Sequence, residues 1–344
     1  MPILKEDFLR AAITRAFESV GTSATDARIV ADHLVDAELC GVTSHGIIRV
    51  PQYLEGVRVG RVKPDACVCV LHEGPATAGL DGGNGFGQVM VHHMVEKALA
   101  LASASGVGIV TLVNCGHSGR LGHYTEQAAR QGCIAMMFVN AGGHGQWVAP
   151  FGGKEGRLST NPFSMAAPSA GDFPVVLDVA TSIAPEGKIR ALKTEGKPVP
   201  EGWILDTHGE PTTNGADLYG PPRGAILPFG GLKGFGLAML IDILAGGLSG
   251  AGCCTRTDAP MDGKTDGILF IAIRPEAFLP AGQLARQVAE LVQHVKSSAP
   301  LPGVSTVMAP GELEHRHRAE RERNGIPVDE EIWRVVEPCL RSST

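Results

Sequence analysis

Apolar side chains recur at helical spacing near both ends of the chain. One such stretch covers residues 4–20. A second helix is expected to begin after Ser23, with Asp26 at the position of a capping-box acid, and to end near Gly41. Toward the other end, residues 311–340 combine a densely charged helical segment with an amphipathic one. The pattern predicts that helices from both termini form one helical unit.

In the middle of the chain, short apolar runs alternate with helical patterns. We predict strands over residues 66–71, 106–114, 133–140, 174–180 and 267–274. We predict helices over residues 89–104, 119–131, 233–248 and 279–296. This alternation is typical of an α/β (α+β) body. Two domains are therefore expected: a discontinuous helical domain with dimer contacts, residues 1–65 and 300–344, and an α/β domain for cofactor and substrate, residues 66–299.

Composition narrows the possible function classes. The chain has 344 residues, 44% hydrophobic and 19% charged, which is ordinary for a globular protein with a well-buried core. Its net charge of −6 gives no basic excess, so we expect no nucleic acid partner. The first residues do not resemble a signal peptide and no long apolar run occurs, so we expect a cytoplasmic protein that does not bind a membrane. The eight cysteines form no CxxC pair and are expected to be buried free thiols.

The usual nicotinamide-binding signature is a glycine-rich turn between a strand and a helix. The nearest match is GGNGFGQ, in which Gly83 and Gly85 fit but Gln88 occupies the place of the third glycine. The sequence therefore does not predict a Rossmann site. His315 and His317 lie in a charged helical segment without further convergent ligands, and we expect no metal site there.

The first candidate cluster contains Ser44, His45 and Arg49, which directly follow a predicted helix. Reduction of a ketone needs a proton donor for the developing alkoxide, and a histidine titrates close to neutral pH. An arginine offers two parallel hydrogen bonds to a carboxylate. The cluster favours an acid/base histidine beside a carboxylate site. A capped helix start with an incidental histidine is the alternative.

Two segments of small residues lie where a helix is expected to begin. Residues 114–123, NCGHSGRLGH, include His117 and Ser118, and residues 228–236, PFGGLKGFG, include Lys233. The N–H groups at a helix N-terminus attract anions, and small residues allow close approach. Both segments are therefore candidate phosphate sites, with a polar strand-to-helix turn as the alternative for the first.

Three further clusters carry polar side chains. Asp178 stands at the end of an apolar strand, where a carboxylate either caps the next turn or orients an imidazole. If its partner is His45, the carboxylate raises the pKa of the imidazole by favouring the charged form. The other two clusters are the segment that ends in Thr160 and Asn161 and the turn Pro310-Gly311-Glu312.

Together, the clusters resemble the malate/L-lactate dehydrogenase family in order and spacing over essentially the whole chain. The similar segments are SHGIIRVPQY, LDGGNGFGQ, HSGRLGHY, STNPF, LDVATS, PFGGLKGFGLAMLIDIL and APGE. Within the family, GKIRALKTEGKPVPEGWILDTHGEPTTN is most similar to the hydroxycarboxylate dehydrogenase B branch. The family also includes sulfolactate, ureidoglycolate and 2,3-diketogulonate enzymes and reductases of cyclic imino acids.

The resemblance implies a fold, an assembly and a set of site residues. The family's cofactor domain is not a Rossmann fold but a largely antiparallel sheet with helices, and its members work as homodimers with the active site near the subunit boundary. The implied catalytic residues are His45, Ser44 and Asp178, and the implied substrate contacts are Arg49 and Thr160. The implied cofactor contacts are His117, Ser118, Asn161, Asp178, Val179, Ala180, Thr181, Ser182, Lys233, Gly234, Pro310, Gly311 and Glu312.

We therefore expect an oxidoreductase that uses NAD or NADP to interconvert a small 2-hydroxy acid and its 2-oxo acid, with His45 as the acid/base. The sequence does not choose between the two nucleotides, because no ribose-binding acid can be placed without the Rossmann frame. The main alternative is an NAD(P)H-dependent reductase of a cyclic imino acid, and a second is a binding protein without catalysis. The expected partners are a small carboxylate substrate and a second copy of the chain.

Overall fold

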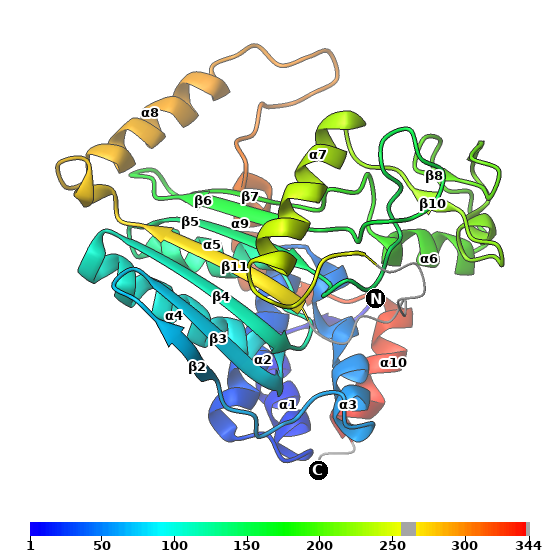
Figure 1. Cartoon of the computed structure of the whole chain (residues 1–344), viewed down its shortest axis with the longest axis horizontal. Helices are drawn as coiled ribbons and strands as arrows, with labels where there is room; N and C mark the ends of the chain where they lie inside the picture. The colour runs from blue at the N-terminus through cyan, green and yellow to red at the C-terminus, as the bar shows by residue number, and fades with distance from the viewer. Residues whose placement is uncertain (256–265, 342–344) are drawn as a thin grey trace.

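A seven-stranded sheet forms the centre of the computed structural model, which describes residues 1–255 and 266–341 (Figure 1). In spatial order its strands are β2 (Cys69–Glu73), β3 (Thr77–Gly85), β4 (Val107–Cys115), β11 (Asp266–Ile273), β5 (Ile134–Asn140), β6 (Phe163–Ala167) and β7 (Val175–Val179). Among these strands β3 and β4 pair in parallel, and every other neighbouring pair is antiparallel. The sheet is therefore largely antiparallel.

Helices cover both faces of this sheet (Figure 1). On one face lie α4 (Gly87–Ser105) and α5 (Leu121–Arg130), and on the other lies α7 (Leu232–Ile241), which continues into a π-helical turn over Asp242–Gly247. The central strand β11 is apolar without interruption from Ile268 to Ile273, because Ile268, Phe270 and Ala272 face the first layer while Leu269 and Ile271 face the second.

Helices from the two chain ends pack together beneath α4. They are α1 (Glu6–Glu18), α2 (Ala24–Leu39), α3 (Val50–Arg58), α9 (Glu312–Asn324) and α10 (Glu330–Arg341). Two 3₁₀ turns, Thr43–His45 and Ile47–Arg49, connect α2 to α3, and the short strands β1 (Ile3–Leu4) and β12 (Ile326–Pro327) pair with each other. The predicted cap of α2 is confirmed, because Ser23 Oγ accepts the N–H of Asp26 at 3.1 Å. One hydrophobic core runs from these helices through α4 into the sheet.

A small lobe with its own core is inserted between β7 and α7 (Figure 1). It contains α6 (Glu186–Thr194), a 3₁₀ turn (Gly215–Leu218) and a sheet of β8 (Ile204–Leu205), β9 (Pro211–Thr212) and β10 (Ala225–Ile226). The hydrophobic pattern did not indicate this lobe, because its strands are only two residues long and show no periodicity.

Two strands of the main sheet were also missed. The segment of β3, TAGLDGGNG, contains four glycines and has the composition of a turn. The close packing explains a glycine there, because a Cβ at Gly82 would lie 3.0 Å from the backbone oxygen of Asn114. The other missed strand is β6, whose five residues are too short for a clear pattern.

The amphipathic helix α8 (Gln283–Lys296), which follows a 3₁₀ turn at Pro275–Ala277, stands away from the sheet, and none of its residues is buried (Figure 1).

All eight cysteines are free, but the expectation of burial was only partly right. Cys69 is exposed on the edge strand β2, and Cys67 is exposed just before that strand. Within residues 1–255 and 266–341, no helix has both the length and the apolarity needed to cross a membrane.

Candidate active site

Most of the predicted site segments meet at one cavity of about 490 Å³. The predicted residues in its lining are Ser44, His45, Arg49, His117, Ser118, Thr160, Asp178, Val179 and Ala180. They come from the turns before α3, the loop between β4 and α5, the segment before β6 and the end of β7. The volume lies within the range of small-molecule sites.

Two consecutive 3₁₀ turns bring His45 and Arg49 to this cavity. The buried carboxyl of Glu38 holds the junction between the turns, because its Oε1 accepts the N–H of Ile47 at 2.9 Å. A Cβ at Gly46 would lie 2.0 Å from the same oxygen, so a larger residue here would force the Glu38 side chain to move. The SHG motif therefore has a structural reason for its glycine in addition to its histidine.

The imidazole of His45 is neutral at neutral pH. Burial is the largest cause that lowers its pKa from 6.5 to about 4, and the charges of Arg49 and Arg120 lower it further. Nδ1 lies 2.9 Å from Ser44 Oγ, and the ring stacks on that of His117 with 5.4 Å between the centroids. A neutral imidazole accepts a proton, so this geometry suits removal of a proton from a hydroxyl group.

Arg49 and Thr160, the predicted substrate contacts, both line the cavity. The guanidinium of Arg49 donates from Nε to the carbonyl oxygen of Ser44 and from Nη1 to Oε1 of Gln52, both at 2.7 Å. The carbonyl oxygen of Thr160 accepts two hydrogen bonds from Thr181, one from its N–H at 3.0 Å and one from its side-chain hydroxyl at 2.8 Å. The side chain of Arg49 and the backbone of Thr160 are thus held in place by the protein.

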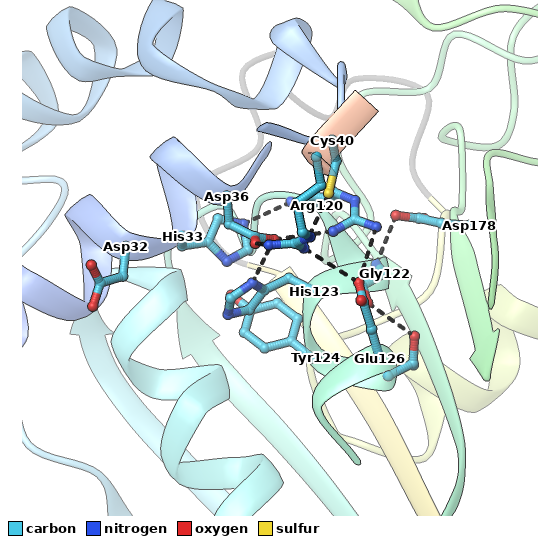
Figure 2. A network of polar contacts seen from close by, with 12 residues as sticks. Asp32, His33, Asp36, Cys40, Arg120, Gly122, His123, Tyr124, Glu126 and Asp178 are labelled. Carbon is cyan, nitrogen blue, oxygen red and sulfur yellow. Dashed lines mark hydrogen bonds and ion pairs between the residues drawn. The ribbon is translucent and has the colours of Figure 1, made fainter. Parts of the chain in front are cut away.

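Asp178 ends β7 at the cavity wall, but its partner is not His45. Its Oδ2 accepts the N–H of Gly122, in the first turn of α5, at 2.7 Å (Figure 2). Burial raises the pKa of this carboxyl, and the positive charge of Arg120 opposes that rise. The hypothesis that Asp178 pairs with His45 and raises the histidine pKa is therefore wrong. The carboxylate instead binds the N-terminus of α5, and the charge of the nearby buried Arg120 favours its ionised form.

Arg120 belongs to a buried network that links the cavity to α2, α5 and α9 (Figure 2). Its Nη1 donates to Asp36 at 3.2 Å, and its backbone N–H donates to Nε2 of His33 at 2.9 Å. Asp36 also contacts His123 Nδ1 at 2.9 Å and pairs with Arg318. Burial alone raises the pKa of Asp36, but these partners outweigh it and hold the pKa well below the usual range. The network thus keeps a charged carboxylate beneath the site.

Asp266 is a second acid that the sequence analysis missed. It opens β11 and lines the cavity, where its Oδ2 accepts the N–H of Ser118 at 3.0 Å and its hydroxyl at 3.1 Å. Burial raises the pKa of Asp266 to about 7, although both bonds from Ser118 work against the rise. An acid at the edge of a predicted apolar strand, the same signal that indicated Asp178, marks this residue in the sequence.

Three other predicted residues lie behind the cavity wall, where they hold neighbouring segments together. Asn161 is fully buried and donates from Nδ2 to the carbonyl oxygen of Ala238 in α7 at 2.9 Å. Thr181 accepts on its carbonyl oxygen the N–H of Phe229 at 3.0 Å. Ser182 is buried and bridges to the loop before α7. These contacts attach the glycine-rich start of α7 to the end of β7.

The predicted cofactor residues Lys233 and Gly234 lie in the first turn of α7, outside the cavity lining, and the side chain of Lys233 is exposed. The turn Pro310-Gly311-Glu312 lies against β7, where the Pro310 carbonyl oxygen accepts the N–H of Val176 at 3.2 Å. The buried Glu312 carboxylate contacts Lys296 and Arg316, each at 2.6 Å. Burial by itself raises the pKa of Glu312, but the bonds to the carboxylate outweigh this effect and lower the pKa to about 2.

The motif GGNGFGQ, which does not match the Rossmann signature, does lie where a strand meets a helix. It joins β3 to α4, and α4 leads to β4, which is parallel to β3. The start of α4 is nevertheless covered by protein. A Cβ at Gly87 would lie 2.3 Å from the carbonyl oxygens of both Gly116 and His117. The glycines of this turn therefore allow contact with the loop after β4, and the neighbouring Gln88 reaches under His117.

The lining suits a nicotinamide ring together with a small acid. Val139, Val179 and Trp147 provide apolar surface, and the groups described above provide donors and acceptors. A nicotinamide has apolar ring faces and a polar carboxamide edge, and small-molecule sites typically combine such walls with a few placed polar groups. His45, a potential proton acceptor, and Arg49, a potential partner for a carboxylate, line the same cavity.

Comparison with known proteins identifies the family of the chain. A family model described as malate/L-lactate dehydrogenase matches residues 4–337. The chain is 39% identical to an L-sulfolactate dehydrogenase of Methanocaldococcus jannaschii, covering 96% of this chain and 94% of the relative, and 36% identical to hydroxycarboxylate dehydrogenase B of Escherichia coli O157:H7, covering 95% and 91%. It is also similar to the crystal structure of a Δ1-piperideine-2-carboxylate reductase from Pseudomonas syringae, with a TM-score of 0.86, 30% identity and coverage of 98% and 100%. The chain therefore belongs to the malate/L-lactate dehydrogenase family.

Proposed function

We propose that this protein is an NAD(P)-dependent dehydrogenase that interconverts a small 2-hydroxy acid and its 2-oxo acid. One observation carries the proposal: a neutral His45 and a cationic Arg49 project into one cavity from adjacent turns. The first can take a proton from a hydroxyl group, and the second can orient a carboxylate on the neighbouring carbon. A 2-hydroxy acid has both groups, a hydroxyl and a carboxylate on neighbouring carbon atoms, and so fits this pair of residues.

In the oxidative direction, His45 receives the proton of the substrate hydroxyl. Its Nδ1 faces Ser44 Oγ at 2.9 Å, so an Nδ1–H donated to Ser44 leaves Nε2 as the base. Arg49 holds the carboxylate, and Thr160 contributes a further polar group to the wall. In the reductive direction the protonated His45 returns the proton to the carbonyl oxygen. Asp178 and the buried Arg120 line the cavity beside these groups.

NAD or NADP, when bound, accepts or supplies the hydride at C2 of the substrate. We infer that His117, Ser118 and the segment Asp178 to Ser182 hold its nicotinamide end, because they line or support the cavity. Asn161 supports the same wall from behind. The remaining candidates are Lys233, Gly234, Pro310, Gly311 and Glu312. They flank β7 and the start of α7, where the dinucleotide would extend away from the substrate.

The proposal is tested with a panel of 2-hydroxy acids and both oxidised nucleotides, and of 2-oxo acids and both reduced nucleotides, followed by nicotinamide absorbance. We expect turnover of at least one acid pair. His45→Asn should lower kcat by a factor of about 10² or more. Arg49→Lys keeps the charge but loses the planar fork, so it should mainly raise KM. His93→Asn, an exposed histidine on α4 outside the site, is the matched control. A binding protein without catalysis would bind nucleotide but turn over no acid.

A second candidate function is reduction of a cyclic imino acid. The structural similarity to the piperideine-2-carboxylate reductase favours it, since that protein has the same overall fold. A cyclic imine carries its carboxylate beside a C=N bond, so Arg49 could hold it in the same way. The same panel should include cyclic imines with both reduced nucleotides. Turnover of an imine with no turnover of any 2-oxo acid would favour this candidate over the first.

We further propose that the protein is a homodimer. Apolar side chains remain exposed on α7 and its continuation and on α8, including Leu240, Ile243, Leu291 and Val295, which lie outside the terminal helices expected from the sequence to make the dimer contacts. Patches of this kind often mark interfaces between protein chains. Light scattering should give twice the 36.0 kDa of the single chain, and Leu240→Glu should shift the population toward the single chain. A wild-type mass of 36.0 kDa would contradict the dimer.

A further inference from the structure

A chain of three hydrogen-bonded side chains, two of them buried, reaches from α4 to the cavity wall. Gln88 Nε2 donates to Tyr53 Oη at 3.0 Å and to the carbonyl oxygen of His117 at 3.1 Å. Tyr53 Oη lies 2.7 Å from His117 Nδ1. Gln88 and Tyr53 are only 1% and 5% exposed, while the ring of His117 lines the cavity and stacks on that of His45. The chain therefore connects the motif GFGQ with the proposed site.

The direction of each hydrogen bond in this chain follows from its chemistry. A carbonyl oxygen can only accept, so the amide of Gln88 must present its NH₂ group to His117 and to Tyr53. The phenol oxygen of Tyr53 thus accepts one bond, and its own proton needs an acceptor because the group is buried. The acceptor within 2.7 Å is His117 Nδ1. That nitrogen must then carry a lone pair.

The remaining proton of His117 is consequently on Nε2. Burial, with the charge of Arg49 and the nearby His45, holds the pKa of His117 well below its usual value, so the ring is neutral. A neutral imidazole with a lone pair on Nδ1 has its N–H at Nε2. No hydrogen-bond partner of Nε2 is found among residues 1–255 and 266–341. The N–H is available to a ligand in the cavity.

Two helices hold the hydrogen-bonded chain of Gln88, Tyr53 and His117 in this geometry. Tyr53 belongs to α3 and Gln88 to the first turn of α4, and both are packed in the main hydrophobic core or beside it. Gly87 lets α4 approach the backbone of His117, since a Cβ there would collide with its carbonyl oxygen at 2.3 Å. Burial raises the pKa of Tyr53 to about 12, so the phenol keeps its proton throughout the neutral range.

We propose that Tyr53 and Gln88 are positioning residues that lock His117 in its neutral Nε2–H tautomer, so that the cavity carries a fixed hydrogen-bond donor beside His45. The donor fits an acceptor oxygen, such as that of a carboxamide or a carboxylate, and this choice of ligand rests on the proposed dehydrogenase function. The lock also separates the roles of the two stacked rings. His117 cannot accept a proton at Nε2, so His45 is left as the base of the pair.

The tautomer can be measured on the ligand-free protein by NMR after labelling the histidines with ¹⁵N. The His117 signals are assigned by their loss in His117→Gln. We expect the Nε2–H form between pH 6 and 9 in the wild type, and a mixture of the two neutral tautomers in Tyr53→Phe, which lacks the phenol proton. Gln88→Met should keep mainly the Nε2–H form, because Tyr53 still donates. Tyr124→Phe is the matched control, since its phenol donates at 2.7 Å to the carbonyl oxygen of Ser118 in the same loop and not to the ring.

Kinetics provides the second measurement. Tyr53→Phe should lower kcat/KM by about 10- to 100-fold, as expected when the partner that orients a site histidine is removed. A wild-type His117 that is protonated, or that carries its proton on Nδ1, overturns the proposal without any variant. An unchanged tautomer in folded Tyr53→Phe also overturns it. The NMR result does not require turnover, so a failure of the dehydrogenase assignment is distinguishable from a failure of the lock.

Discussion

The lowered pKa of His45 predicts an unusual pH dependence of catalysis. Oxidation needs the neutral imidazole, and kcat/KM reports the protonation state of the free enzyme. With a pKa of about 4, about 90% of His45 is neutral at pH 5, whereas an ordinary histidine of pKa 6.5 would be only about 3% neutral there. Between pH 8 and pH 5, kcat/KM for the hydroxy acid should therefore stay nearly constant instead of falling by about 30-fold.

The reductive direction should have the opposite dependence. It needs protonated His45, whose population falls tenfold for each pH unit above the pKa. From pH 5 to pH 8, kcat/KM for the 2-oxo acid should drop by about a thousandfold while the oxidative value is flat. The ratio of the two constants then changes tenfold per pH unit, as the release of one proton in the overall oxidation requires.

Initial rates at low substrate concentration, measured with a constant-ionic-strength buffer series, test both slopes. Activity after return from pH 5 to pH 7 controls for acid damage. Arg49→Gln removes the second-largest cause of the low pKa, so the acid limb of the oxidative profile should move upward by about one pH unit. Burial, the largest cause, remains. A wild-type acid limb between pH 6 and 7 would refute this account of His45.

Three further changes test the structure around the site. Asp36→Asn should lower the free energy of unfolding at pH 7 by about 3–5 kcal/mol in urea titrations, because it removes the carboxylate that buried Arg120 shares with Arg318 and leaves both, among the described residues, only Glu126 at 3.6 Å; an effect below about 1 kcal/mol would contradict this. Gly87→Ala should cost about 1–3 kcal/mol in the same assay, since the new Cβ forces a backbone shift at His117, and a neutral result would show that the loop yields freely. Lys233→Ala should raise the nucleotide dissociation constant, followed by nicotinamide fluorescence, more than it lowers kcat, and an unchanged constant would remove Lys233 from the cofactor site.

The local pattern of apolar residues was sufficient to predict most of the longer helices and strands. The predicted helix over residues 89–104 is α4 at Gly87–Ser105, and the predicted strand over residues 133–140 is β5 at Ile134–Asn140. Such elements are visible because their apolar positions repeat with the period of the helix or follow in a continuous buried run. The segment of β3 was missed because its glycines hide the strand pattern, and they are there to let backbones approach closely.

The polar clusters can be identified in the sequence alone, and most of them do converge on one cavity. The hydrogen-bond partners within and between the clusters depend on how the chain folds. Asp178 was free to pair with a cation or with a backbone N–H, and the placement of α5 supplies the N–H of Gly122. Tyr53 and His117 are 64 positions apart, so no local spacing predicts their hydrogen bond. The pKa of His45 is lowered first by burial, then by Arg49 of the same motif and by Arg120, which lies 75 positions away, so its direction depends on the packing of the chain as well as on the motif.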